Sequence, residues 1–402
     1  MRILYLHQYF NTPDMPGSTR SYELARRLVT NGHKVCLVTT NRDKYQDKQI
    51  GWTNESGIQV CWLPIAYSNQ MGFFRRIYSF LLFSFKALKV CLKINVDVVF
   101  ATSTPLTIAI PAIIHSKIRQ RPMVFEVRDL WPEIPIAMGI IKSKIFIKMA
   151  NWLENIAYRN SKRIIALSNG IQSGISQSGY PINQISVITN LSNMEKFNIN
   201  GMFGNMDLNE FEWNENTPTV IYTGAFGHVN DVHYLVKTAE VMKKLNPRVK
   251  FIIAGEGIKG TNIREFAQKV DVLNKSLYVI DPLIKSEIPK LYARASIVTS
   301  LFINLKALWD NSANKFFDGL AAGKPIMINY SGWQRELLEK HKAGFYVPHD
   351  KPEEGAIKLN QILNEPSQLE FMGKAARQLA EEKFSIDAQY PRFEKELLFA
   401  LD

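Results

Sequence analysis

The sequence has few of the residues that stabilise small secreted proteins or hold metals. Its 402 residues include only three cysteines, Cys36, Cys61 and Cys91, which lie far apart and match no metal-ligand spacing. The chain opens on a short apolar run, residues 2–7, that reads as a buried strand without the cleavage site of a secretory signal. We therefore expect reduced thiols in a reducing compartment.

Long apolar runs are also scarce. One long uncharged and largely apolar stretch, from Val98 to Ser116, is interrupted by Pro105 and Pro111. Although its length nearly admits a membrane span, this interrupted pattern predicts a strand, a turn and a buried helix.

Acidic residues are scarce in the first half only. Residues 1–195 hold 23 Lys and Arg against 11 Asp and Glu, whereas residues 196–402 hold 26 of each, so the net charge of +12 lies entirely in the first half. A one-sided basic half favours an anionic partner such as lipid headgroups or a diphosphate, the alternative being a solvated face with no partner. No nucleic-acid recognition motif accompanies the charge, and we expect no nucleic-acid partner.

Short apolar runs alternate with helical patterns throughout, and Val- and Ile-rich runs of this kind are typical of parallel sheets covered on both faces. Because the chain is also too long for one core, we predict an α/β protein with two Rossmann-like domains that face each other across a cleft. The expected domains are residues 1–195 and 196–384, divided by a polar stretch over 195–217, with a helix over 385–402 that packs back on the first domain. The expected strands are 2–7, 34–39, 96–101, 123–127, 163–167, 219–222, 250–253, 276–280, 296–299 and 325–328.

Glycine-containing loops follow the first strand of each half, where ligands bind in such sheets. Gly17 precedes the helix over 21–30, and Arg20 adds charge there. In the second half, Gly224 and Gly227 follow the expected strand 219–222. Glu256 lies between two glycines after the following strand, 250–253. The dinucleotide fingerprint G-x-G-x-x-G is missing, but these loops suit backbone approach to phosphates, with plain tight turns as the alternative.

Two polar segments complete the candidate site. Asp310 and Asp318 are separated by seven residues, and Asn311 and Ser312 are candidate caps of a helix that begins near Ser312. A carboxylate before such a helix suits sugar hydroxyls, while free amides and Lys315 suit a diphosphate; a purely structural amphipathic helix is the alternative. The loop 125–133 concentrates the charged residues Glu126, Arg128, Asp129 and Glu133 after a strand.

These segments resemble glycosyltransferase family 4, the retaining enzymes of GT-B fold, over nearly the whole chain. The resemblance rests on Asp310-x7-Asp318 with Ala-Ala-Gly-Lys-Pro, on Thr-Gly-Ala-Phe-Gly from Thr223, on Arg-Asp-Leu-Trp-Pro from Arg128, and on Asn190 at the domain crossing. The family usually has two Glu where this chain has Asp310 and Asp318, and often His where it has Arg128. It also often carries Arg and Lys where this chain has Ala225 and Asn230, and Lys315 is our candidate replacement.

The resemblance implies a UDP-sugar donor, a lipid-diphosphate-linked sugar acceptor, transfer with retention and no metal or other cofactor. It implies a front-face displacement through an oxocarbenium-like state. The variant is most similar to transferases of bacterial O-antigen and capsule assembly, among them those that use UDP-N-acetyl-L-fucosamine. The residues expected at the reacting centre are Arg128, Asp129, Asp310 and Lys315; on the donor side Gly17, Gly224, Gly227, Glu256, Leu283, Asn311, Ser312 and Asp318; and on the acceptor side Arg20, Glu126 and Glu133.

The segment 71–89 is rich in phenylalanine and basic residues and contains no acid. This composition is typical of a helix that lies in a membrane interface, with a buried core helix as the alternative. We expect it to dock the enzyme peripherally on the anionic cytoplasmic face of a bacterial plasma membrane. Two other functions stay open: an enzyme similar to UDP-N-acetylglucosamine 2-epimerases, which share the architecture, and a non-catalytic sugar-binding protein.

Overall fold

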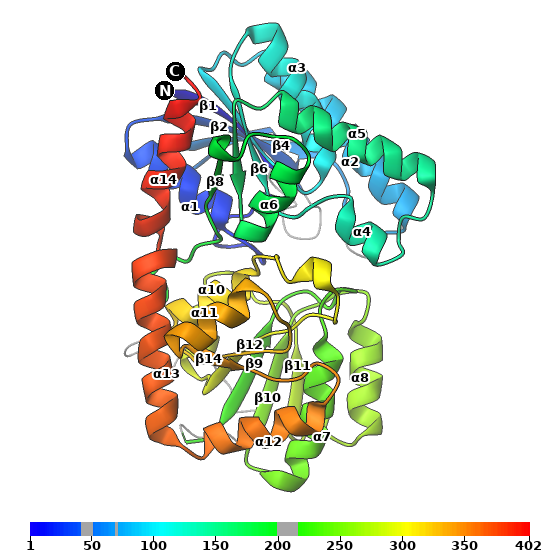
Figure 1. Cartoon of the computed structure of the whole chain (residues 1–402), viewed down its shortest axis with the longest axis vertical. Helices are drawn as coiled ribbons and strands as arrows, with labels where there is room; N and C mark the ends of the chain where they lie inside the picture. The colour runs from blue at the N-terminus through cyan, green and yellow to red at the C-terminus, as the bar shows by residue number, and fades with distance from the viewer. Residues whose placement is uncertain (42–50, 69–70, 199–215) are drawn as a thin grey trace.

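The computed structural model describes residues 1–41, 51–68, 71–198 and 216–402. It confirms the predicted fold class: two α/β domains, each built on a largely parallel sheet, lie one above the other in Figure 1. In the first sheet only β3 runs antiparallel to its neighbour. In order across that sheet, the strands are β3 (Gly51–Glu55), β4 (Ile58–Pro64), β2 (Lys34–Asn41), β1 (Arg2–Leu6), β5 (Val98–Thr102), β6 (Met123–Val127), β7 (Arg163–Ala166) and β8 (Ile185–Val187).

Helices cover both faces of this first sheet because its central strands are apolar on both sides. One face is covered by α2 (Phe73–Cys91), α3 (Ala109–Arg119), α5 (Lys144–Arg159) and α6 (Asn169–Gln177). The other face is covered by α1 (Arg20–Thr30) and by α14 (Ile386–Phe399). The short helix α4 (Glu133–Ala137) follows β6.

The second sheet is wholly parallel, with the strand order β11 (Leu277–Ile280), β10 (Lys250–Ala254), β9 (Thr219–Thr223), β12 (Ile297–Ser300), β13 (Ile326–Ile328) and β14 (Gly344–Tyr346). One face packs on α7 (Val232–Leu245), α8 (Gly260–Lys269) and α12 (Pro352–Leu363). The opposite face packs on α9 (Ile288–Ala293), α10 (Asn314–Ala321), α11 (Trp333–His341) and α13 (Pro366–Leu379).

The uncharged stretch from Val98 to Ser116 forms β5, a 3-10 turn (Leu106–Ile108) and the start of α3. Among the described residues, no helix combines the length and the apolar character that crossing a bilayer requires.

The chain passes between the domains twice, and the two crossings lie side by side. Ser192, on the outward crossing, donates its amide to the carbonyl of Phe384 at 3.0 Å and forms a bridge with Ser385 on the return crossing. After the return, α14 packs on the first domain (Figure 1), where Phe393 meets Phe100 of β5 edge to face at 5.0 Å. The final helix therefore ties the last residues of the chain to the first sheet.

Candidate functional site

The loop after β1 reaches the second domain. The amides of Lys285 and Ser286 donate to the carbonyls of Met15 and Pro13 at 3.2 and 3.1 Å. Nearby, the Ser18 hydroxyl donates to Asn314 Oδ1 at 3.0 Å, at the first residue of α10. The predicted first loop and the start of the predicted donor helix are thus brought together across the domain boundary.

Lys315, the second residue of α10, lies in an aromatic and polar surrounding. Its ammonium donates to the hydroxyl of Tyr222 at 3.1 Å and to Asn230 Oδ1 at 3.2 Å. It also lies 4.4 Å from the ring centroid of Tyr222 and 5.8 Å from that of Phe302. Within the described residues no carboxylate pairs with it, and burial lowers the pKa of Lys315 to about 7. A desolvated cation without a counter-charge favours an incoming anion.

The glycine loop after β9 lies directly against this lysine. Gly224 has a φ of +141°, and a Cβ there would come within 3.2 Å of Lys315 Cε. The loop after β10 packs closely on the glycine loop. A Cβ at Gly255 would overlap the carbonyl oxygen of Gly224, so this close packing requires glycine at position 255. The Phe226 amide donates to the Glu256 carbonyl at 2.8 Å. The structure therefore brings the predicted residues Gly224, Glu256 and Lys315 into one cluster, whose role in donor binding stays a prediction.

Three other predicted donor residues lie in loops that follow the strands β1, β9 and β11. Gly17 has a φ of +117°, and a Cβ there would meet the Asn11 side chain, so the first loop requires glycine at this position. Gly227 is more open, since the atom nearest to a Cβ at this position would be Asn230 Nδ2, at 3.6 Å. Leu283 is half-buried and packs on the core of the second domain.

Arg20 and Glu126, predicted on the acceptor side, pair with each other, and their role in acceptor binding stays a prediction. Their side chains are completely buried and form an ion pair at 2.7 Å. Arg20 also donates to the carbonyls of Ile188 and Thr189, while Thr102 donates to the second oxygen of Glu126 at 2.8 Å. Burial opposes the charged carboxylate, but Arg20 and Arg128 outweigh it and lower the pKa of Glu126. The pair links α1 to β6.

Arg128 and Asp129 lie at the end of β6 and remain candidates for the reacting centre. The Arg128 amide donates to the Ser103 hydroxyl at 2.9 Å, and its guanidinium lies 3.4 Å from His7 Nε2. Thr104 hydrogen-bonds the Asp129 side chain, whose pKa burial raises. Thr104 has a φ of +84°, a rare conformation for a β-branched residue and one that clusters at functional sites. Sequence reasoning missed His7 and Thr104.

Glu133, the third residue predicted on the acceptor side, begins α4 and is exposed. It lies apart from the buried pair, and its role in acceptor binding stays a prediction.

Asp310 lies against the first domain. Its carboxylate occupies the space that a Cβ at Gly170 would fill, and the Ser168 hydroxyl, which caps α6, donates to the Asp310 carbonyl at 2.7 Å. Burial raises the pKa of Asp310, with Lys306 opposing the rise. The carboxylate therefore meets the N-terminal turn of α6, an arrangement that stabilises a negative charge. A contact with the donor sugar stays a prediction.

The predicted caps of α10 are wrong. The cap position is Ala313, which provides no side-chain cap. The Ser312 hydroxyl instead accepts from the Asn190 amide at 3.2 Å, and the Asn190 side chain donates to the Ser312 carbonyl. Asn311 accepts from the Ser312 amide at 2.7 Å. Asn190, at the domain crossing, thus anchors the segment before α10 and leaves the first amides of this helix without side-chain caps.

Asp318, predicted on the donor side, has partners within the protein, and its role in donor binding stays a prediction. It is buried, with one carboxylate oxygen accepting from the Ser192 hydroxyl at 2.9 Å and the other paired with Lys285. Because both oxygens have partners, the structure makes Asp318 a link between α10 and the domain crossing. Lys285 and Ser192 are residues that sequence reasoning missed.

The contact between Gly170 and Asp310 leads to a prediction about the domain boundary. Gly170→Ala should destabilise the protein by about 1–3 kcal/mol, as overpacking does, because the added methyl group displaces the carboxylate. Urea unfolding measures this loss. The double variant Gly170→Ala with Asp310→Ala should regain most of the stability, and equal losses in the single and double variants would contradict the contact.

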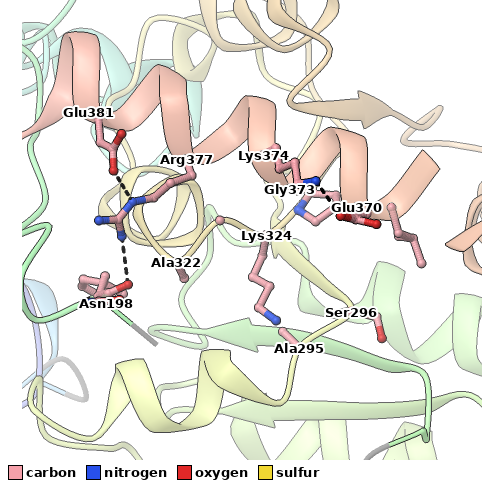
Figure 2. Close-up of a pocket in the computed structure, with 14 residues that line it drawn as sticks. Asn198, Ala295, Ser296, Ala322, Lys324, Glu370, Gly373, Lys374, Arg377 and Glu381 are labelled. Atoms are coloured by element: carbon pink, nitrogen blue, oxygen red, sulfur yellow. Dashed lines mark hydrogen bonds and ion pairs between the residues drawn. The ribbon is translucent and has the colours of Figure 1, made fainter. Parts of the chain in front are cut away.

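A cavity of about 610 Å³ lies at the other end of the second sheet (Figure 2). Ser296 and Pro325, which line it, immediately precede β12 and β13, so the cavity adjoins the amino ends of these strands. Lys324 lines it too, donates to the Ala293 carbonyl at 3.2 Å, and has its pKa lowered to about 8 by burial. The predicted donor residues follow the carboxyl ends of the strands, so this cavity is separate from them.

No group of three or more His, Cys, Asp or Glu side chains gathers in a metal-binding arrangement within the part of the chain that the structure describes.

Two family models match the chain, each over somewhat less than half of it. Residues 17–196 match glycosyltransferase family 4, and residues 206–379 match glycosyl transferases group 1. Spore coat protein SA of Bacillus subtilis is 25% identical over 172 residues, which are 41% of this chain and 44% of that protein. An uncharacterized glycosyltransferase of Methanocaldococcus jannaschii is 20% identical over 252 residues, 60% of each chain. The chain thus spans under two thirds of both relatives.

A solved structure agrees over nearly the full length. HepE of Anabaena, in complex with UDP and glucose, aligns with a TM-score of 0.73 and 17% identity, covering 99% of both chains. At this identity the likeness concerns the fold, and the two family models account for one domain each. The chain therefore has the GT-B fold, and each of its two domains matches one glycosyltransferase family model.

Proposed function

We propose that this chain is a glycosyltransferase that moves a sugar from a UDP-sugar to a polyprenyl-diphosphate-linked saccharide. The observation that carries the donor half of the proposal is Lys315. This half-buried lysine has no carboxylate partner in the described residues and lies against Gly224. A diphosphate would supply the missing negative charge. The complexes of Anabaena HepE with UDP and with UDP-glucose support a nucleotide-sugar donor for this fold.

The chemistry follows from where charge develops during transfer. As the bond from the sugar to UDP breaks, negative charge grows on the diphosphate, and fixed donors stabilise it without reorganisation. Lys315, the Gly224 loop and the uncapped start of α10 would hold this charge. Retention by a front-face displacement requires the acceptor hydroxyl on the same face of the sugar. Asp129, with its pKa raised by burial, is our candidate to receive the proton of that hydroxyl.

The finer assignment concerns the sugar and the pathway. Arg-Asp-Leu-Trp-Pro from Arg128 and Asn-Lys-Phe-Phe-Asp from Asn314 support a role in bacterial O-antigen or capsule assembly, with N-acetyl-L-fucosamine as the first donor sugar to test. No metal is required in this scheme, because a lysine and helix amides neutralise the leaving group. The basic first half and α2 support a position on the anionic cytoplasmic face of the plasma membrane.

The test is a two-stage assay. UDP-sugars, including UDP-N-acetyl-L-fucosamine, are first screened for thermal stabilisation of the full chain, with the matching GDP-sugars as controls. Those that stabilise are then incubated with a synthetic polyprenyl-diphosphate disaccharide, and UDP release is measured with and without it. Acceptor-dependent release supports transfer. Conversion of the sugar without acceptor would instead support the epimerase, and binding without either reaction a sugar-binding protein.

A further inference from the structure

The first domain exposes two apolar helix stripes on one side. In α2, exposed apolar residues recur at spacings of four, three and four from Phe74, and in α5 at spacings of four and three from Ile145. These spacings place each set on one face of its helix. We call the two stripes together the α2–α5 face: Phe74, Tyr78, Leu81 and Phe85 from α2, and Ile145, Phe146, Met149 and Trp152 from α5.

Both stripes point away from the same face of the sheet. The inner residues Phe83 and Ala87 of α2 and Ala157 and Tyr158 of α5 belong to one buried core with the strands, whereas α1 and α14 cover the opposite face. Figure 1 shows α2 and α5 on one side of the first domain. The exposure is large: Phe74 is 78%, Ile145 71% and Trp152 65% accessible. Large apolar side chains that gather this exposed on one face of a helix mark sites of interaction.

The charges around this face are of one sign. Arg75, Arg76 and Lys89 accompany the α2 stripe, and Lys142, Lys144 and Lys148 accompany the α5 stripe. No acid occurs in 71–89 or in 134–153. None of these exposed cations takes part in an ion pair within the described residues.

The nearest acid of α5, Glu154, adds less negative charge to this surface than an exposed carboxylate would. Glu154 is half-buried, accepts from the Tyr158 hydroxyl at 2.7 Å, and has its pKa raised to about 7 by burial. Apolar stripes flanked by unpaired Lys and Arg therefore match an anionic bilayer, into which aromatic side chains insert while cations meet headgroups.

We propose that α5 binds an anionic membrane surface together with α2, so that the docking surface consists of two helices and not of the segment 71–89 alone. The purpose of this surface, delivery of a lipid-linked acceptor, rests on the proposed function. The chain itself supports the link: α5 follows Asp129 through the short helix α4. Docking of α5 would therefore fix the loop that carries Arg128 and Asp129 near the headgroups.

The experiment compares the binding of three forms of the full chain to vesicles by flotation: wild type, Met149→Glu with Trp152→Glu, and Ile357→Glu with Phe371→Glu. The last pair is a matched control, since Ile357 and Phe371 are similarly exposed but lie on the second domain. With vesicles of phosphatidylcholine and about 30% phosphatidylglycerol, we expect the α5 variant to bind at least tenfold more weakly than wild type and the control variant to bind equally.

A charge variant and two further readouts separate the remaining explanations. Replacing Lys142, Lys144 and Lys148 by Gln should weaken binding to the anionic vesicles about tenfold and leave the weak binding to pure phosphatidylcholine unchanged. An α5 variant that floats like wild type would overturn the proposal. A second outcome would also overturn it: analytical ultracentrifugation shows that the wild type is a dimer, and the α5 substitutions dissociate this dimer without changing flotation. UDP-induced stabilisation, measured on the same variants, should not change; its absence in wild type would count against the proposed donor and leave the membrane result standing.

Discussion

Replacing Lys315 by alanine is expected to lower the rate of transfer on the order of 100-fold or more, as removal of a single oxyanion donor does. The lysine, the second residue of α10, supplies a positive charge that lies against Gly224. The loss should appear in kcat/KM for the UDP-sugar and in the thermal stabilisation given by UDP. Lys315→Arg should retain part of the activity, because the charge remains while its geometry changes.

Lys324→Ala is the matched control for this prediction. Lys324 is also a half-buried lysine with a lowered pKa, but it lies at the amino ends of the strands beside the separate cavity (Figure 2). The control should leave UDP-induced stabilisation unchanged. Equal losses of UDP binding in Lys315→Ala and Lys324→Ala would show that half-buried lysines stabilise the domain, and would remove the main support for the donor site.

The pH dependence of donor affinity provides an independent test. Burial lowers the pKa of Lys315 to about 7, so the free enzyme loses this charge as the pH rises above 7. A bound diphosphate favours the protonated form, and binding must therefore take up a proton above that pH. Affinity for the UDP-sugar should fall as pH rises from 7 to 9, by up to about tenfold per unit. Titrations by calorimetry in two buffers would measure the proton uptake, which Lys315→Arg should abolish.

The buried parallel strands and the two-domain plan were predictable because apolar runs of four to seven residues leave few alternatives to a covered sheet. The hairpin β3–β4 was missed, although Ser56 and Gly57 between its strands both have positive φ and form the type of turn that Ser-Gly indicates. The strands β8 and β14 have three residues each, too short for a pattern.

The candidate site could be predicted only where its residues lie in loops that directly follow predicted strands. Lys315 and Gly224 follow from loops at strand ends, since the carboxyl ends of parallel strands meet at one edge. The partners of Asp318, Arg20 and Asp310 lie far from them along the chain, and two of these three contacts cross the domain boundary. Sequence patterns record which residues are polar but do not specify which of them pair. For the same reason the stripe on α5 was missed, because helical spacing does not tell an inward face from an outward one.

The buried pair of Arg20 and Glu126 should have the largest effect on stability. Arg20→Ala leaves the Glu126 carboxylate charged and unpaired in the core, and removing one partner of such a pair typically costs about 3–5 kcal/mol. Urea unfolding should show this loss, and Glu126→Ala should give a similar one. The matched control is Arg335→Ala, which breaks an exposed pair with Glu339 and should change stability by less than about 1 kcal/mol.

A double variant distinguishes a structural pair from an acceptor contact. Arg20→Met with Glu126→Leu removes both charges at once, so it should be less destabilised than either single alanine variant, although the carbonyls of Ile188 and Thr189 lose a donor. If the pair only positions α1 and β6, the double variant should keep its KM for the lipid acceptor. A rise in that KM of tenfold or more, with stability close to wild type, would instead support a contact between Arg20 and the acceptor. A side chain that touches substrate changes binding without unfolding the domain.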